Sequence, residues 1–247
     1  MLFDFRVFTG QSFDGKKQTA DELLRSMDNL KIEKALACPL KPLSYDMRQA
    51  NAGLAQDIKT HQDRLIGAAR IDPWQPEAVD LLQRAHEEYG MRALFLNPWE
   101  ENFRADHPIL DPLMAMVEKY RIPVLLASGY PWVSEALQVC RLALRWPKVA
   151  VVMTNGGQIN ISGLGQADAT LAMQKAPNLH IDTAGVYRQD FIEETLEALG
   201  GERVLFGSGA PYFDQRYETR RVLMVKTNDS ARQAMQAGNA LRLLNLF

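Results

Sequence analysis

Polar side chains that could do chemistry stand directly after short apolar runs in this sequence. The carboxylates at such places, Asp4 and Asp182, are candidates for a general base, provided that burial raises their pKa. Arginines can grip an anionic ligand, while amides, hydroxyls and aromatic rings can orient and enclose it. The candidate ligand-binding residues are Arg6, Arg70, Asn97, Ser128, Asn155, Ser208, Tyr130 and Tyr212.

The apolar runs recur at a regular spacing. They begin near Leu2, Ile32, Leu65, Met91, Ile122, Val149, Leu179 and Val204. Amphipathic helical patterns fill the gaps, and successive runs begin 25 to 33 residues apart. This spacing is the size of one strand with its crossover helix. Eight such units without a Pro/Gly/Ser-rich linker predict one α/β domain over residues 1–247, a (β/α)8 TIM barrel with its site at the carboxyl ends of the strands.

An open, doubly wound sheet is the alternative fold. It would place a glycine-rich phosphate loop after the first strand, and no G-x-G-x-x-G stands there. The stretch GGQINISGLG from Gly156 follows the sixth run with another spacing, so we interpret it as a flexible loop at the barrel mouth. Near the carboxyl end, the pair Gly238–Asn239 is expected to separate the last two helices.

Composition excludes several classes of function. A formal net charge of -2 and a pI of about 6.1 leave no basic footprint for nucleic acid or an anionic membrane. Only two cysteines occur, Cys38 and Cys140, and no signal-peptide pattern is present, so we expect a reduced, cytoplasmic protein. No run approaches the ~18 apolar residues of a membrane span.

Six stretches, in order, resemble the amidohydrolase-2 branch of the amidohydrolase superfamily. They are LIGAARIDPWQPEAVDLLQRAHEEYGMRALFLNP, RIPVLLASG, WPKVAVVMTNGG, APNLHIDTAG, RVLFGSGAP and GNALRLL. The resemblance implies a metal-dependent (β/α)8 barrel with hydrolase or decarboxylase chemistry. It also suggests a homodimer, since barrels of this branch often pair.

The metal ligands that the resemblance implies are missing. The family pattern opens with Asp-x-His-x-His, which Asp4 begins, and continues with a histidine after the fifth strand, another after the sixth and an aspartate after the eighth. The five ligand positions hold Arg6, Phe8, Ala127, Asn155 and Gly209. Zinc and its relatives need imidazole, thiolate or carboxylate donors, so we expect no metal and no other cofactor.

Without a bound metal, the protein would lose a large part of the free energy that helps to form hydroxide from water. A bound metal lowers the pKa of water from 15.7 to about 7, which at about 1.36 kcal/mol per unit is roughly 12 kcal/mol. No histidine is expected at a strand end to compensate. His61 and His86 fall on helical patterns, His107 falls in a loop, and His180 falls early in the seventh strand.

The two arginines each have two interpretations. Asp4 and Arg6 are two residues apart on one strand and are expected to face the same side. Arg6 would then either form an internal ion pair with Asp4 or act as a fork for an anionic ligand. Arg70 would either pair with Asp72 at the entry of a loop or bind the ligand.

The sequence is compatible with two functions. One is an enzyme that acts on a lactone, amide or carboxylate without a metal, with Asp182 or Asp4 as base. The other is a catalytically inactive barrel that binds a small polar or anionic molecule, or pairs with a partner subunit. Both need a small-molecule site or a protein contact, and neither needs a nucleic acid or a membrane.

Overall fold

Parallel strands form the centre of the molecule. The computed structural model describes residues 1–159 and 163–246. The strands are β1 Phe3–Gln11, β2 Lys17–Gln18, β3 Lys34–Pro39, β4 Leu65–Arg70, β5 Ala93–Leu96, β6 Val124–Leu126, β7 Val151–Met153, β8 Leu179–Asp182 and β9 Val204–Leu205. The short β2 pairs antiparallel with the end of β1, and all other neighbours pair in parallel in the order β1-β3-β4-β5-β6-β7-β8-β9.

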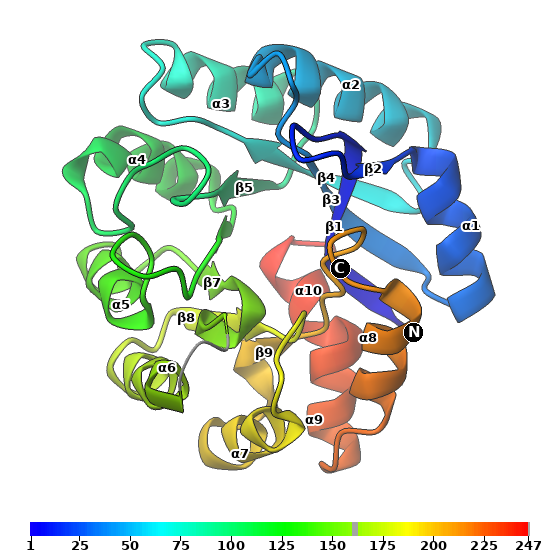
Figure 1. Ribbon diagram of the computed structural model, residues 1–247, viewed down its shortest axis with the longest axis vertical. Helices are drawn as coiled ribbons and strands as arrows, with labels where there is room; N and C mark the ends of the chain where they lie inside the picture. The colour runs from blue at the N-terminus through cyan, green and yellow to red at the C-terminus, as the bar shows by residue number, and fades with distance from the viewer. Residues whose placement is uncertain (160–162, 247) are drawn as a thin grey trace.

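Backbone hydrogen bonds between β1 and the segment around β9 close the sheet into a barrel. Phe5 N donates to Phe206 O at 2.7 Å, Gly209 N donates to Arg6 O at 2.8 Å, and Phe8 N donates to Ala210 O at 2.7 Å. The bonds advance along both segments in the same direction, as in a parallel pair. The fold is therefore the predicted (β/α)8 barrel, seen down its mouth in Figure 1.

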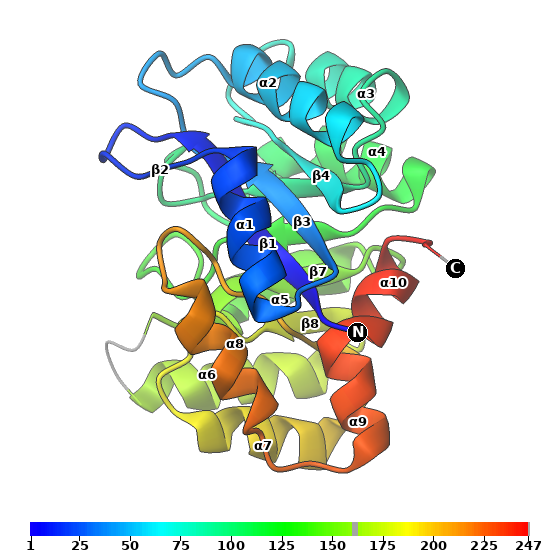
Figure 2. The same cartoon turned by 90° about the vertical axis from the view of Figure 1, so that its right-hand side faces the viewer.

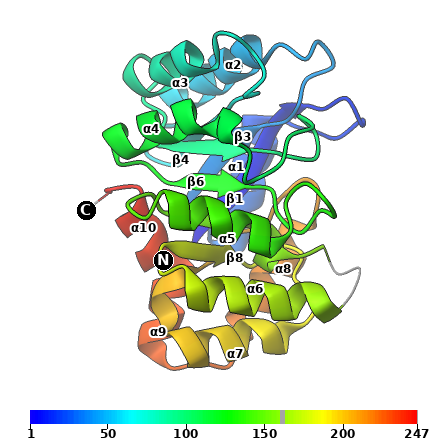
Figure 3. The ribbon, with the colours of Figure 1, turned by 90° about the vertical axis from the view of Figure 1, so that its left-hand side faces the viewer.

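Helices surround the barrel on all sides (Figures 1 and 3). They are α1 Ala20–Leu30, α2 Met47–Thr60, α3 Ala78–Glu87, α4 Asp111–Tyr120, α5 Ala136–Arg145, α6 Gly163–Lys175, α7 Gln189–Leu199, α8 Gln215–Leu223, α9 Asp229–Gln233 and α10 Asn239–Leu243, with the short helical turns η1 Pro108–Leu110, η2 Thr154–Gly157, η3 Gly201–Arg203 and η4 Ala234–Gly238. In Figure 2 both termini lie on one side and the β2 hairpin on the other, so the termini are at the end of the barrel opposite the mouth.

Two apolar layers explain why the strands are so uniformly hydrophobic. Every residue of β4, LIGAAR, is buried, because one face of each strand packs inside the barrel and the other packs on helices. The inner layer includes Phe3, Phe5, Leu36, Phe95, Leu125, Val152 and Leu205. The outer layer includes Leu23, Leu82, Leu113, Leu142 and Ile192.

Local signals in the sequence begin several of the helices. Before α1, Glu22 N donates to Thr19 Oγ1 and Thr19 N donates to the Glu22 carboxylate, which is a complete capping box. Asp214 caps α8 in a similar way by accepting from Tyr217 N. Such caps fix where each helix starts and therefore where each loop at the barrel mouth ends.

The predicted break at Gly238–Asn239 is wrong. The chain continues from α9 through the π-helical turn η4 into α10 without leaving helical geometry, and Gly238 has φ -56°. Asn239 instead ties this helix to the barrel, since its Nδ2 donates to Gly201 O at 2.7 Å and Val204 O at 2.8 Å. In the part of the chain that is described, no helix combines the length and the apolar character needed to cross a bilayer.

Candidate functional site

A small pocket opens at the carboxyl ends of the strands. Its volume is about 130 Å³, below the roughly 300–1,000 Å³ of most small-molecule sites, so it suits a compact molecule or one end of a larger one. Its lining comes from β1 and from the ends of β5, β6, β7 and β9. The lining residues are Arg6, Phe8, Phe95, Asn97, Glu100, Ala127, Tyr130, Thr154, Asn155, Tyr212 and Phe213.

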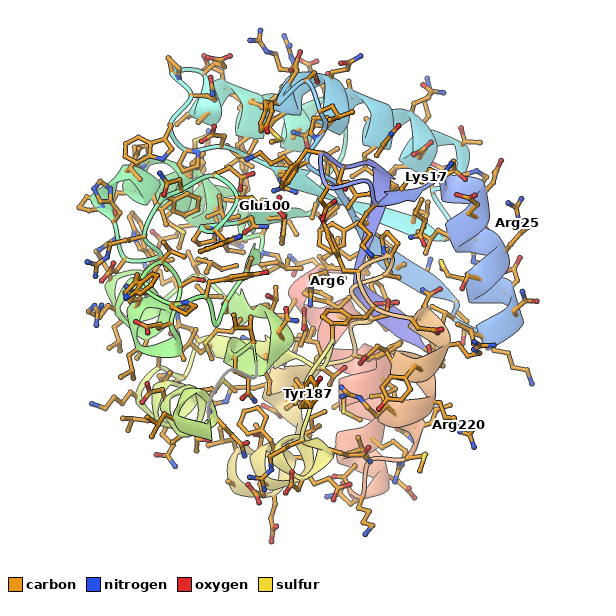
Figure 4. The ribbon with its side chains drawn as sticks, viewed as in Figure 1. Arg6, Lys17, Arg25, Glu100, Tyr187 and Arg220 are labelled. Carbon is orange, nitrogen blue, oxygen red and sulfur yellow. The ribbon has the colours of Figure 1, made fainter. Side chains whose placement is uncertain are left out.

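Arg6 supplies the cationic wall of this pocket. Its Nε donates to Asp182 Oδ2 at 2.6 Å, and its Nη2 donates to Asp182 Oδ1 at 3.2 Å and to Asn155 Oδ1 at 3.1 Å. The guanidinium carbon lies 5.8 Å from the centre of the Phe8 ring. Arg6 is thus held rigidly by a fork of two oxygens while it still borders the pocket, near the centre of Figure 4.

The predicted ion pair between Arg6 and Asp4 is wrong, because the two side chains do not face the same side. The register of β1 against β3 shifts between Asp4 and Val7. Such an irregularity inserts an extra residue and changes which side chains alternate. Phe5 stays in the barrel interior and Arg6 borders the pocket, while Asp4 contacts α8 on the outside of the barrel.

Asp182, at the end of β8, is fully buried and is committed to protein partners. Besides Arg6, its Oδ1 accepts from Asn155 N at 2.8 Å and from Ala184 N at 3.2 Å. The carboxylate therefore joins β1 to the ends of β7 and β8. A base must reach the proton that it abstracts, and these contacts place Asp182 behind Arg6 rather than in the pocket lining.

Helix α8 supports this region from outside. The buried Arg221 donates from Nη2 to Thr183 O at 2.6 Å and from Nη1 to Val186 O, and it lies 3.0 Å from the Glu218 carboxylate. Burial raises the pKa of Glu218 to about 7. The loop after Asp182 is therefore fixed by α8, which explains how the Arg6 partner keeps its position.

Asp4 is the second structural carboxylate. Its Oδ1 accepts from Ser208 N at 2.7 Å and its Oδ2 accepts from Gln215 Nε2 at 2.9 Å. Burial raises the pKa of Asp4 to about 6, although these hydrogen bonds oppose the shift. Asp4 thus ties β1 to the end of β9 and to α8, and it does not line the pocket.

The raised pKa of Asp4 predicts a measurable pH dependence of stability. The folded state binds this proton more tightly than the unfolded state, so the contribution is present below the ordinary value of 3.8 and is lost as the pH rises through about 6. Between about pH 4 and pH 7, the Asp4 carboxyl should lower the unfolding free energy of the wild type by about 2–3 kcal/mol. This decrease should be absent in Asp4→Asn. Urea unfolding at both pH values measures this, with the exposed Asp63→Asn as control. Equal pH slopes in Asp4→Asn and the wild type would contradict it.

Arg70 lies in a separate buried network beside the pocket. Its Nη2 donates to Glu100 and, at 2.7 Å, to Glu101, and Lys41 Nζ lies 3.7 Å from the Glu101 carboxylate. The predicted pairing of Arg70 with Asp72 is wrong, because Asp72 accepts from Trp74 N at 3.0 Å and caps the following turn. Arg70 does not line the pocket either.

The two candidate serines are also turned away from the pocket. Ser128 Oγ donates to Leu126 O at 2.6 Å, and Ser208 Oγ accepts from Ala210 N at 3.2 Å. Both are fully buried and stabilise the chain where a strand ends. Neither serine lines the pocket, whereas Thr154 does so beside Asn155.

Asn97, Tyr130 and Tyr212, which the sequence suggests as ligand-binding residues, line the pocket. Tyr130 stacks on Trp99 with ring centres 5.5 Å apart, and Tyr212 meets Phe8 edge to face at 5.4 Å. The sequence interpretation missed three lining residues, Glu100, Phe95 and Phe213. Glu100 could have been found, because it follows the same strand end as Asn97.

None of the four histidines lies at the pocket. His61 ends α2, His86 lies in α3, and His107 caps η1. His180 lies in β8, where burial lowers its pKa to about 4. These placements agree with the sequence interpretation.

The positions at which the resemblance implies metal ligands do meet in space, but their side chains do not fit a divalent cation. Arg6, Phe8, Ala127 and Asn155 all line the pocket. A Cβ built on Gly209 would lie 2.9 Å from Phe213 Cδ2 and 3.3 Å from Arg6 Nη1, so the Phe213 ring and the guanidinium occupy the space in front of that position. Among the described residues, no group of three His, Cys, Asp or Glu side chains could hold a metal ion.

Fold and site together define a TIM barrel with a small arginine-containing pocket at its mouth. The amidohydrolase family model matches residues 44–246, and the chain belongs to this family. No curated protein matches the chain by sequence.

Solved structures share this fold at low sequence identity. An uncharacterized TIM-barrel protein from Bordetella bronchiseptica has a TM-score of 0.80 and 18% identity, covering 99% of this chain and 98% of its own. A 2,6-dihydroxybenzoate decarboxylase from Rhizobium has a TM-score of 0.76 and 18% identity, covering 99% and 98%. A 4-oxalomesaconate hydratase from Rhodopseudomonas palustris has a TM-score of 0.74 and 19% identity, covering 99% and 96%.

Proposed function

We propose that this protein binds a small organic acid in the pocket at the barrel mouth, and that it does so without a metal ion. The observation that carries the proposal is the position of Arg6. Its guanidinium is fixed by Asp182 and Asn155 and borders a pocket walled by aromatic rings. An arginine held in this way offers a permanent, preoriented charge to a carboxylate.

The similar solved structures support an organic acid as the ligand class. The names of two of them give 2,6-dihydroxybenzoate and 4-oxalomesaconate, both of which are carboxylates. The aromatic walls of this pocket, formed in part by Phe8, Tyr130 and Tyr212, suit the flat apolar part of such a molecule.

Binding is better supported than turnover. A metal-free hydrolase needs a base that reaches the ligand, and both candidate bases are used elsewhere: Asp182 holds Arg6, and Asp4 holds Ser208 and α8. Of the described residues that line the pocket, only Glu100 carries a carboxylate. The proposed function is therefore that of a binding protein built on an amidohydrolase barrel.

Benzoate is a suitable probe for this proposal. We expect calorimetry to detect benzoate binding that a chelator leaves unchanged, in a protein whose metal content is well below one ion per chain. Arg6→Lys should weaken binding about tenfold or more, because the fork geometry is lost while the charge remains. The exposed Arg188→Lys serves as control. One firmly held metal ion per chain, or binding that disappears with the chelator, would overturn the proposal.

A further inference from the structure

The pocket lining contains a second charged side chain, Glu100, whose charge is opposite to that of Arg6. Arg6 and Asn155 reach the pocket from β1 and from the end of β7. Glu100 and Asn97 reach the pocket from the segment after β5. Figure 4 shows Arg6 near the centre of the mouth and Glu100 on the side of β5. The rings of Phe8 and Tyr212, which meet at 5.4 Å, belong to the same lining.

Glu100 is held by several hydrogen bonds, but its side chain stays partly exposed. Its N–H donates to Asn97 Oδ1 at 3.3 Å, its carbonyl accepts from Lys41 Nζ, and its carboxylate accepts from Arg70. The Glu100 side chain retains 14% exposure, whereas that of its neighbour Glu101 retains 1%. Of the two adjacent carboxylates, only Glu100 is therefore available to a ligand.

The charges around the pocket balance. Arg6 is paired with Asp182, and the cations Arg70 and Lys41 face the anions Glu100 and Glu101. A simple anion would gain from Arg6 but would be repelled by Glu100 across the same small cavity. A ligand with a positive group at its far end would be attracted by both Arg6 and Glu100.

Tyr212 belongs to the same lining, but its hydroxyl is not open to the pocket. This hydroxyl, which the Ser12 side chain approaches, is buried from solvent. Its pKa is raised by burial and by the nearby carboxylates of Glu100 and Asp14. Tyr212 therefore contributes its ring, rather than a free hydroxyl, to the pocket.

We propose that the pocket selects a small zwitterion, with a carboxylate bound by Arg6 and Asn155 and an ammonium group bound by Glu100. This inference rests on the proposed function and adds to it the second pole of the ligand. The aromatic walls would contact the spacer between the two poles, and their ring faces also favour a cation.

Three probes on the full chain test the inference: benzoate, benzylamine and 4-(aminomethyl)benzoate, each titrated calorimetrically. We expect the zwitterion to bind at least about tenfold more tightly than either single-charge probe. Glu100→Gln should remove that advantage and should tighten benzoate binding, because the repelling carboxylate is gone, and this gain also shows that the variant is folded. The control is Glu197→Gln on the exposed face of α7.

The outcomes separate this inference from the proposed function. If benzoate binds and the zwitterion gains nothing, only the present inference is overturned. If the zwitterion is preferred equally by the wild type and by Glu100→Gln, Glu100 is not the second pole and the inference is likewise overturned. If none of the three probes binds, the proposed function fails together with it.

Discussion

Replacing Arg6 with methionine should lower the free energy of unfolding by about 3–5 kcal/mol and abolish benzoate binding. Both partners of the pair are buried, with side-chain exposures of 6% for Arg6 and 0% for Asp182. The methionine fills similar space but leaves the Asp182 carboxylate buried without a counter-charge. Urea unfolding near neutral pH measures the loss of stability, and calorimetry measures the loss of binding.

A second substitution distinguishes loss of charge balance from loss of packing. Adding Asp182→Asn to Arg6→Met should recover stability to within about 2 kcal/mol of the wild type, because the asparagine oxygen can still accept from Asn155 N and Ala184 N.

The control for Arg6 is Arg188→Met on the surface. Arg188 pairs with Asp190, and both side chains are at least half exposed. Exposed pairs contribute little, so this variant should stay within about 0.5 kcal/mol of the wild type. An Arg6→Met protein as stable as the Arg188→Met protein would show that the guanidinium does not balance Asp182.

Local patterns in the sequence were sufficient to predict the barrel. Each predicted strand start lies within two residues of an observed strand, for example Val149 against β7 at Val151 and Ile122 against β6 at Val124. Strands buried on both faces read as short apolar runs, and their regular spacing leaves few other topologies. The convergence of Arg6, Asn97, Tyr130 and Asn155 on one pocket follows from that topology.

The carboxylate with which Arg6 forms its ion pair could not be predicted from the sequence, because the pairing depends on contacts between distant segments. Arg6 has one carboxylate two residues away and another 176 residues away, and it pairs with the distant one. The deciding feature is the irregularity between Asp4 and Val7, which leaves no mark in residue types. The prediction that Ser128 and Ser208 would line the pocket is wrong for a related reason. A serine hydroxyl forms a hydrogen bond with nearby backbone as readily as it faces a pocket.

The adjacent residues Glu100 and Glu101 show the same limit at closer range. The sequence presents two equal carboxylates after β5, and the fold seals one and opens the other. Both carboxylates bind Arg70 from β4, but only the Glu101 carboxylate also lies 3.7 Å from Lys41 Nζ. The difference between the two glutamates therefore depends on contacts with β4 and with the segment after β3, which the local sequence does not show.

Arg70→Met should also destabilise the protein by about 3–5 kcal/mol, and it should alter the pocket without touching its lining. Arg70 is 1% exposed, and its loss leaves Lys41 alone against the carboxylates of Glu100 and Glu101. The guanidinium also lies 5.5 Å from the centre of the Phe95 ring, so its removal opens space beneath that wall.

The binding readout makes this prediction specific to the network. Without Arg70, Glu100 loses the contact that holds its carboxylate, so the preference for 4-(aminomethyl)benzoate over benzoate should fall, whereas benzoate itself should still bind through Arg6. Arg48→Met, which removes an exposed pair with Glu77, should change neither stability nor preference. An Arg70→Met protein that loses stability but keeps the full preference for the zwitterion would show that Glu100 is positioned by its backbone contacts to Asn97 and Lys41 rather than by Arg70.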